Sequence, residues 1–101
     1  LVVRVIGENP FAPGSRRWSA AQVVSGMDGC TVASIVRALT ALELETGSGK
    51  PGNPKRWLTH FGGMESAEAG KAMEPTIELL HGGELIRSRA AFWELCRQYE
   101  L

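Results

Sequence analysis

Residues 31–42, TVASIVRALTAL, show the clearest periodicity in this chain. Apolar side chains recur there at spacings of three and four, which places them along one side of an α-helix. They are Val32, Ile35, Val36, Leu39 and Leu42. Thr31 is a favoured N-cap residue, and Gly47 stands where a glycine commonly ends a helix. The stretch therefore predicts an amphipathic helix that buries one face.

Two further helices are predicted, one on either side of this one. Upstream, Ser15 is a suitable N-cap for a helix over residues 16–26. Downstream, Asn53 and Pro54 supply an N-cap and a first-turn proline for a short helix over residues 54–61. The side of this short helix expected to face inward comprises Trp57, Leu58 and Phe61. The side expected to face outward comprises Lys55, Arg56, Thr59 and His60.

The two ends of the chain predict a small β component and a last helix. The β-branched residues of segment 1–8 predict an N-terminal strand. Residues 76–87, TIELLHGGELIR, fit either a β-hairpin that turns at the central glycines or a helix that ends at them. Ser88 is a suitable N-cap for a helix within residues 88–100. The apolar side of that helix comprises Phe92, Cys96 and Tyr99, with Trp93 beside them.

Length and composition indicate a single domain spanning residues 1–101. The chain has 101 residues and a mass of 10.9 kDa, with 44% hydrophobic and 22% charged residues, which are ordinary values for a folded domain. No apolar run approaches the ~20 residues of a membrane-spanning helix. The two cysteines form no CxxC pair, which argues against a disulfide framework. With no leader visible, we expect a cytoplasmic α+β domain that is mainly α-helical and has no membrane partner.

The net charge is zero, but the charges are unevenly distributed along the chain. Residues 1–63 carry seven basic and four acidic side chains, whereas residues 64–101 carry four basic and seven acidic ones. Residues 46–64 contain no acidic side chain. The basic and titratable residues of that stretch are Lys50, Lys55, Arg56 and His60. This distribution predicts a positive patch on one side of the domain, although an ordinary solvated surface can have the same composition.

The order of the predicted elements matches a winged helix-turn-helix domain. Two helices joined by a tight turn are followed by a short basic helix and then by the segment that fits a hairpin. In that fold the third helix enters the DNA major groove, and the hairpin contacts the DNA backbone. We therefore predict a winged-helix-like core of three helices over residues 15–61, with an additional C-terminal helix.

Three short motifs support this interpretation. They are Asn9-Pro10 with Gly14-Ser15-Arg16, then Asp28-Gly29-Cys30-Thr31-Val32-Ala33, then Asn53-Pro54-Lys55-Arg56. On these motifs, roughly residues 9–61 resemble small winged-helix-like domains of phages and other mobile elements. The resemblance implies a third helix that is preceded by a turn and followed by strands, and it implies a role in DNA binding.

The nucleic-acid hypothesis assigns a role to each basic or polar residue near the third helix. Phosphate contacts need only positive charge within reach, whereas base reading needs donors and acceptors on the recognition helix. Phosphate contacts are assigned to Lys50, Lys55, Arg56, Arg16 and Arg17. Base contacts are assigned to Arg56, Thr59 and His60. The expected partner is duplex DNA, and the expected role is that of a regulator or adaptor from a mobile element.

The sequence contains no recognisable arrangement for catalysis or for binding a metal or cofactor. It has no GxSxG motif and no cysteine–histidine pair close in sequence. The loop GSGKPG, residues 47–52, departs from a Walker loop because Pro51 follows the lysine. His60 and His81 have no neighbouring set of metal ligands in the sequence. We therefore expect a non-catalytic protein without a metal or cofactor.

The alternative hypothesis is a protein–protein interaction module, either a homodimer or an inhibitor of another protein. The opposite charges of the two parts of the chain would allow head-to-tail pairing between copies. The C-terminal helix also contains aromatic residues of the kinds enriched at interfaces. The residues assigned to such an interface are Phe92, Trp93 and Tyr99.

Overall fold

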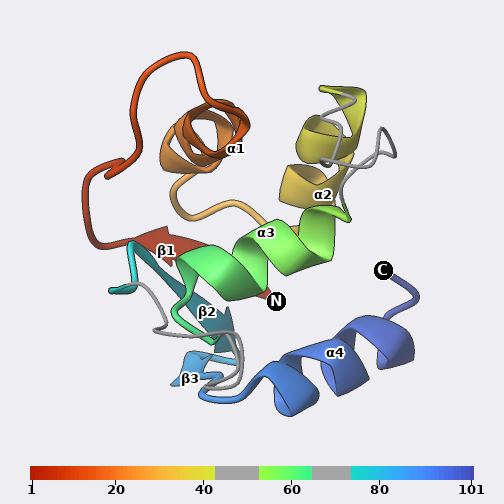
Figure 1. Cartoon of the computed structure of the whole chain (residues 1–101). Coiled ribbons are helices and arrows are strands. Elements are labelled where there is room, and N and C mark those ends of the chain that lie inside the picture. Colours follow the sequence, from red (N-terminus) through yellow and green to blue (C-terminus); the bar gives the residue numbers. More distant parts are fainter. Residues whose placement is uncertain (43–52, 65–73) are drawn as a thin grey trace.

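The computed structural model describes residues 1–42, 53–64 and 74–101. In this part of the chain there are four helices and three strands (Figure 1). In chain order they are β1 (Val2–Val5), α1 (Arg16–Ser25), α2 (Val32–Ala41), α3 (Pro54–Phe61), β2 (Ile77–His81), β3 (Glu84–Leu85) and α4 (Arg89–Gln98). The small, mainly helical α+β fold predicted from the sequence is confirmed. Residues 76–87 form the hairpin and not the helix.

The three strands form one antiparallel sheet in the order β1-β2-β3. Val3 pairs with Leu79, so the N-terminal strand lies beside a strand from far along the chain. β2 and β3 are joined by Gly82 and Gly83, whose φ angles are 59° and 84°. Two successive positive φ angles suit the tight turn of a hairpin, and glycine adopts them without the steric cost of a side chain.

The other edge of β1 is covered by the turn between α1 and α2. The backbone N–H of Val3 donates to the carbonyl of Cys30 at 3.0 Å, and the N–H of Gly29 donates to the carbonyl of Val3 at 2.8 Å. The N–H of Val5 donates to the carboxylate of Asp28, also at 2.8 Å. β1 is therefore hydrogen-bonded on both edges, and this turn joins the first two helices to the sheet.

Each helix begins at the N-cap residue that the sequence predicts. In every case the side-chain oxygen accepts a hydrogen bond from a backbone N–H of the first turn, which would otherwise lack a partner within the helix. The four caps are Ser15, Thr31, Asn53 and Ser88. The helix starts are therefore determined by local sequence.

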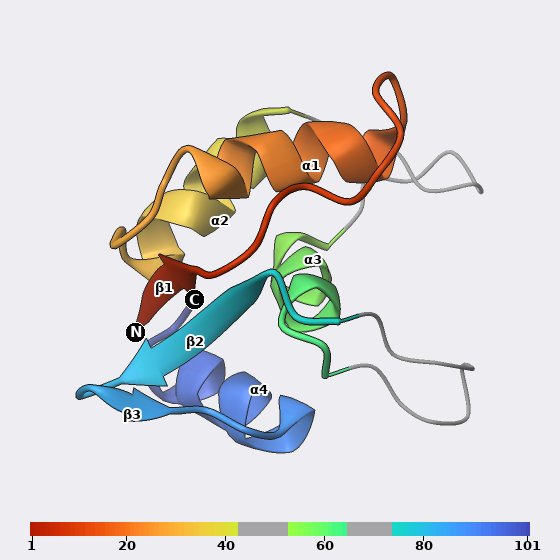
Figure 2. The same ribbon diagram turned by 90° about the vertical axis from the view of Figure 1, so that its left-hand side faces the viewer.

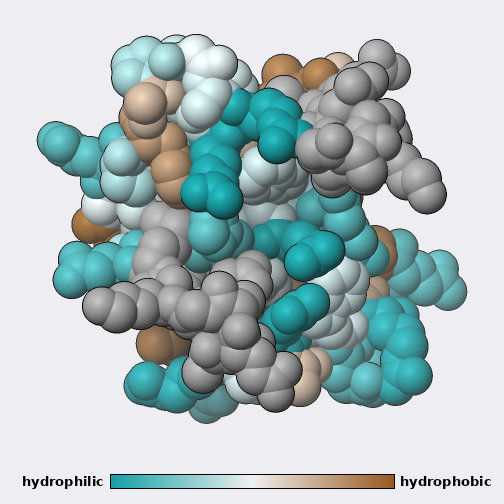
Figure 3. Space-filling model, in the orientation of Figure 1, coloured by the Kyte–Doolittle hydropathy of each residue, from teal (hydrophilic) through white to brown (hydrophobic). Residues whose placement is uncertain are grey.

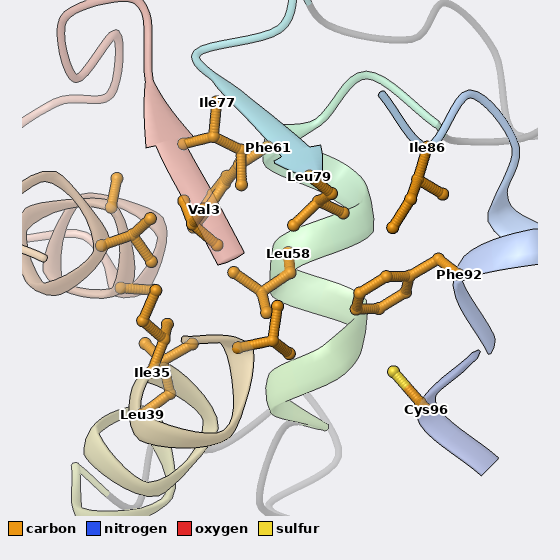
Figure 4. Close-up of a cluster of buried hydrophobic side chains, with 14 residues drawn as sticks. Val3, Ile35, Leu39, Leu58, Phe61, Ile77, Leu79, Ile86, Phe92 and Cys96 are labelled. Atoms are coloured by element: carbon orange, nitrogen blue, oxygen red, sulfur yellow. The ribbon is translucent and has the colours of Figure 1, made fainter. Parts of the chain in front are cut away.

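Helix α3 lies at the centre of the core, between the sheet, α2 and α4 (Figures 1 and 4). Its Leu58 and Phe61 are almost completely buried. The surrounding elements add Val3, Ile77 and Leu79 from the sheet, Ile35 and Leu39 from α2, and Phe92 and Cys96 from α4. Because these side chains share one buried cluster, α3 is enclosed on most of its circumference.

Two apolar residues that the sequence places on buried helix faces are exposed. Leu42 is 41% exposed and Tyr99 is 54% exposed. Each is the C-cap residue directly after the last residue of its helix, α2 or α4. Helical spacing sets the direction of a side chain but not how far the packed neighbours extend along the helix, so a residue at the helix end can be exposed. The predicted C-cap at Gly47 lies outside the described residues.

Candidate nucleic-acid interface

Helix α3 presents only a narrow side to solvent. Leu58 faces the core, and Arg56 and His60 project from the opposite side because they lie two residues before and after it. Trp57 packs on the ring of Phe61, with ring centroids 5.8 Å apart. Arg56 is exposed, whereas His60 is half-buried. The part of α3 that can meet a ligand is therefore mainly Arg56, together with part of His60.

Thr59 does not reach the surface, so its predicted role in reading bases is wrong. Its side chain is fully buried, and its hydroxyl donates to the carbonyl of Arg56 at 3.0 Å. Thr59 is four residues after Lys55, which places it on the side of α3 that faces α4. A threonine can be buried there because a hydrogen bond within its own helix satisfies the hydroxyl.

Lys55 connects α3 to α4 and does not project outward with Arg56. Its ammonium donates to the carbonyl of Leu101 at 2.7 Å and lies 5.1 Å from the centroid of the Trp93 ring. The two contacts hold the charge at the wall of an open cleft of about 670 Å³. The cleft is lined by Lys55, Ala90, Trp93, Glu94, Cys96, Arg97, Glu100 and Leu101. These contacts assign Lys55 to the junction of α3 and α4.

Substitution of Lys55 should change stability and not nucleic-acid binding. We expect Lys55→Ala to lower the free energy of unfolding by about 1–2 kcal/mol, because it removes a hydrogen bond and a cation–π contact. The matched control is Arg56→Ala, which changes an exposed residue of the same helix and should stay within about 0.5 kcal/mol of the wild type. Urea denaturation measures both values, and equal stability of the two variants would contradict the assignment.

The loop before α1 packs against α3, a contact that none of the sequence patterns above predicts. The ring of Phe11 stacks on His60 with centroids 6.1 Å apart, and it lies 5.8 Å from the ring of Phe61. Asn9 holds this loop against α1. Its Oδ1 accepts from the N–H of Phe11, and its Nδ2 donates to the carbonyl of Trp18, both at 3.1 Å. An aromatic residue directly after an Asn-Pro pair is the signal that could have identified this anchor.

This loop brings the start of α1 to the same side of the molecule as the open side of α3. Figures 1 and 2 show the start of α1 and helix α3 toward the viewer of Figure 1, and Figure 3, in the same orientation, shows hydrophilic residues over the centre of that side. Arg16 and Arg17 lie in the first turn of α1 and are exposed, as Arg56 is on α3. Neither first turn contains an acidic residue. We call Arg16, Arg17 and Arg56 the basic face; Lys50 lies outside the described residues.

The hairpin does not flank the basic face, so the expected position of the wing is wrong. β2 pairs with β1, and its inner side packs against α3. Figure 2 shows the hairpin turn on the opposite side of the molecule from the start of α1. The reason is the N-terminal strand, because pairing with β1 holds the hairpin in the core sheet. Spacing within residues 76–87 cannot reveal a partner that lies so far away in the sequence.

The residues assigned to a protein interface do not form one continuous exposed surface. Phe92 is fully buried in the core, so its assignment to an interface is wrong. Trp93 is half-buried between the ring of Phe92, whose centroid is 6.4 Å away, and the ammonium of Lys55. Tyr99 is exposed, and its hydroxyl lies 2.9 Å from Nε2 of His81. Helical spacing places Phe92 and Tyr99 on one side of α4, but Phe92 lies in the core and Tyr99, at the end of the helix, is exposed.

No family model, curated protein or solved structure matches this chain. Among residues 1–42, 53–64 and 74–101, no group of three or more histidine, cysteine, aspartate or glutamate side chains is placed to hold a metal ion. None of the helices in these ranges is long and apolar enough to cross a membrane. The inference of function therefore depends on the surfaces of the described residues.

Proposed function

We propose that this domain binds duplex DNA through the basic face, as a non-catalytic cytoplasmic regulator or adaptor of mobile-element origin. The observation that carries the proposal is that Arg16, Arg17 and Arg56 are exposed, and that the start of α1 and helix α3 lie on one side of the molecule. Guanidinium groups stay charged at physiological pH and donate in a fork that matches phosphate oxygens. The first turns of α1 and α3 contain no acidic residue that would weaken the attraction to phosphates.

Binding through the basic face depends on phosphates more than on bases. α3 is enclosed by the sheet, α2 and α4, so it offers a narrow side and not the protruding surface that enters a major groove. Three phosphate contacts predict a slope of about −2.7 for the logarithm of the association constant against the logarithm of salt concentration. We therefore expect sequence-tolerant binding that is roughly 40-fold weaker at 200 mM than at 50 mM salt.

The test is a titration of a labelled random duplex, followed by fluorescence anisotropy at about 50 mM and about 200 mM salt. The double variant Arg17→Glu with Arg56→Glu should bind at least about tenfold more weakly at low salt, because two attractive contacts become repulsive. The matched control is Arg87→Glu. Arg87 is also exposed, but it lies between β3 and α4, at the other end of the molecule from α1 (Figure 1). This control should keep the wild-type affinity.

Three outcomes would count against the proposal. A wild-type protein that does not bind the duplex at low salt would remove its basis. Equal losses in the double variant and in Arg87→Glu would show a general effect of charge and no defined face. Tighter binding of a single strand of the same length would replace duplex DNA as the partner, because single strands are bound through stacking as well as charge.

A further inference from the structure

The sheet has a second side that is largely apolar and does not contribute to the core. Side chains alternate along a strand, and Val3, Ile77 and Leu79 point into the core. The strand residues that point to the other side are Val2, Arg4, Glu78, Leu80 and Leu85, and Ile6, directly after the end of β1, continues the same alternation. The four apolar members are not among the described residues that form the core or pack against it, and Ile6 is 51% exposed. We call these six residues the outer sheet face.

No described helix lies over the outer sheet face, although Val2, Leu80 and Leu85 are half-buried. In Figure 2 the three strands lie toward the viewer, and the helices lie beside and behind them. An antiparallel sheet with one side in water usually alternates apolar residues on the core side with polar residues on the other. Four aliphatic side chains among six positions depart from this rule. An apolar sheet side of this kind is typical of a surface that another protein surface covers.

The two charged residues of the outer sheet face are complementary to each other and lie side by side. Arg4 and Glu78 are directly opposite in the register of β1 and β2, and Nε of Arg4 donates to Oε1 of Glu78 at 2.8 Å. Val2 and Leu80 are opposite each other in the same way. Consider a two-fold axis that is parallel to the strands, lies in the plane between two facing sheets, and passes over the gap between β1 and β2. This axis places each residue of a pair opposite the other member of the same pair in the second copy.

We propose that a second copy of this chain covers the outer sheet face in a symmetric dimer. With that axis, Arg4 of each copy faces Glu78 of the other, and Val2 faces Leu80. Such a dimer is isologous, so both copies use the same surface, and its sheets pack with nearly aligned strands. The contact lies on the side of the sheet away from α3, so it does not rest on the proposed DNA binding and leaves the basic face accessible.

The small size of the outer sheet face indicates a weak dimer. Stable interfaces usually bury about 800 Å² on each partner, from about 20 residues or more, and this face offers only six outward positions. We therefore expect a dissociation constant on the order of 100 μM. Sedimentation equilibrium from about 10 μM to about 1 mM covers this range and should show the average mass rising from that of a monomer toward that of a dimer.

Two single variants test which surface makes the contact. Leu80→Lys should abolish the rise in mass, because it places a charge at the centre of the apolar part of the interface. Leu42→Lys is the matched control, since Leu42 is an exposed leucine at the end of α2. It should dimerise as the wild type does. A wild type that stays monomeric up to about 1 mM, or a Leu80→Lys variant that still dimerises, would overturn the proposal.

A mixing experiment tests the pairing of Arg4 with Glu78 between copies. Arg4→Glu and Glu78→Arg should each be monomeric alone, because like charges then face each other twice across the axis. An equimolar mixture should form a heterodimer at least about tenfold more tightly than either variant forms a homodimer, since every facing pair is again opposite in charge. Thermal unfolding checks that both variants are folded. A mixture that stays monomeric while the wild type dimerises would exclude this arrangement.

Discussion

Replacing Phe92 with alanine is expected to lower the free energy of unfolding by about 3–5 kcal/mol. The ring has no exposed surface and lies in the cluster that α4 forms with α3 and the sheet (Figure 4). Removing it leaves a cavity that rigid neighbours fill only in part. Domains of this kind are stable by roughly 5–15 kcal/mol in total, so the loss is a large share of the whole. Guanidinium denaturation of dilute protein measures it.

The matched control for Phe92→Ala is Tyr99→Phe in the same helical segment. Tyr99 is 54% exposed, and its hydroxyl lies 2.9 Å from Nε2 of His81, which is also exposed. Its replacement should change the stability by no more than about 1 kcal/mol. If Phe92 belonged to an interface with another protein, the isolated domain would lose little on substitution. An unchanged unfolding energy for Phe92→Ala would therefore refute the position of α4 in the core.

The two thiols should differ in their rate of modification by at least about 10³ under native conditions. Cys96 is 1% exposed, so a reagent reaches it only after α4 opens or the domain unfolds. Cys30 is half-buried and needs no such opening. Burial also raises the pKa of the Cys96 thiol, against the opposing effect of the Lys55 charge, and this lowers the fraction of reactive thiolate. Mass spectrometry after a timed pulse of reagent identifies the modified cysteine.

The raised pKa of Cys96 also predicts the direction of a pH effect. Above about pH 8.5 the thiol of the unfolded chain ionises while the buried thiol keeps its proton, so stability falls as the pH rises through this range. A Cys96→Ala variant should lack this part of the decrease. The variant Cys30→Ser isolates Cys96 for the rate measurement. Modification of Cys96 in that variant as fast as that of Cys30 in the wild type would mean that α4 detaches readily.

The helix starts could be predicted because their causes are local. Ser15, Thr31, Asn53 and Ser88 each cap a backbone N–H two or three residues away, within the reach of a short pattern. The hairpin turn is local in the same sense, since two glycines supply its positive φ angles. The choice between hairpin and helix for residues 76–87 was open because it depends on β1, which pairs with β2 from the other end of the chain.

The sequence predicts the candidate site correctly only at residues whose side-chain chemistry alone favours exposure. Arg16, Arg17 and Arg56 are exposed as expected, because a guanidinium group is rarely buried without a partner. Thr59 and Lys55 were misplaced because α4 packs against their side of α3, and a polar residue can be buried or held there by local contacts. Phe11 was missed because its partner His60 lies far along the sequence.

Local sequence accounts for the type and start of each helix, for the ability of residues 76–87 to turn at two glycines, and for which residues carry charge. Periodicity and caps act over a few residues, so one chain segment contains their causes. Packing in three dimensions determines which sides of α3 are covered, that the hairpin joins the core sheet, and that one side of the sheet is apolar without belonging to the core. Those features arise from packing between segments that are far apart in the sequence, and no local sequence pattern indicates how such segments are placed.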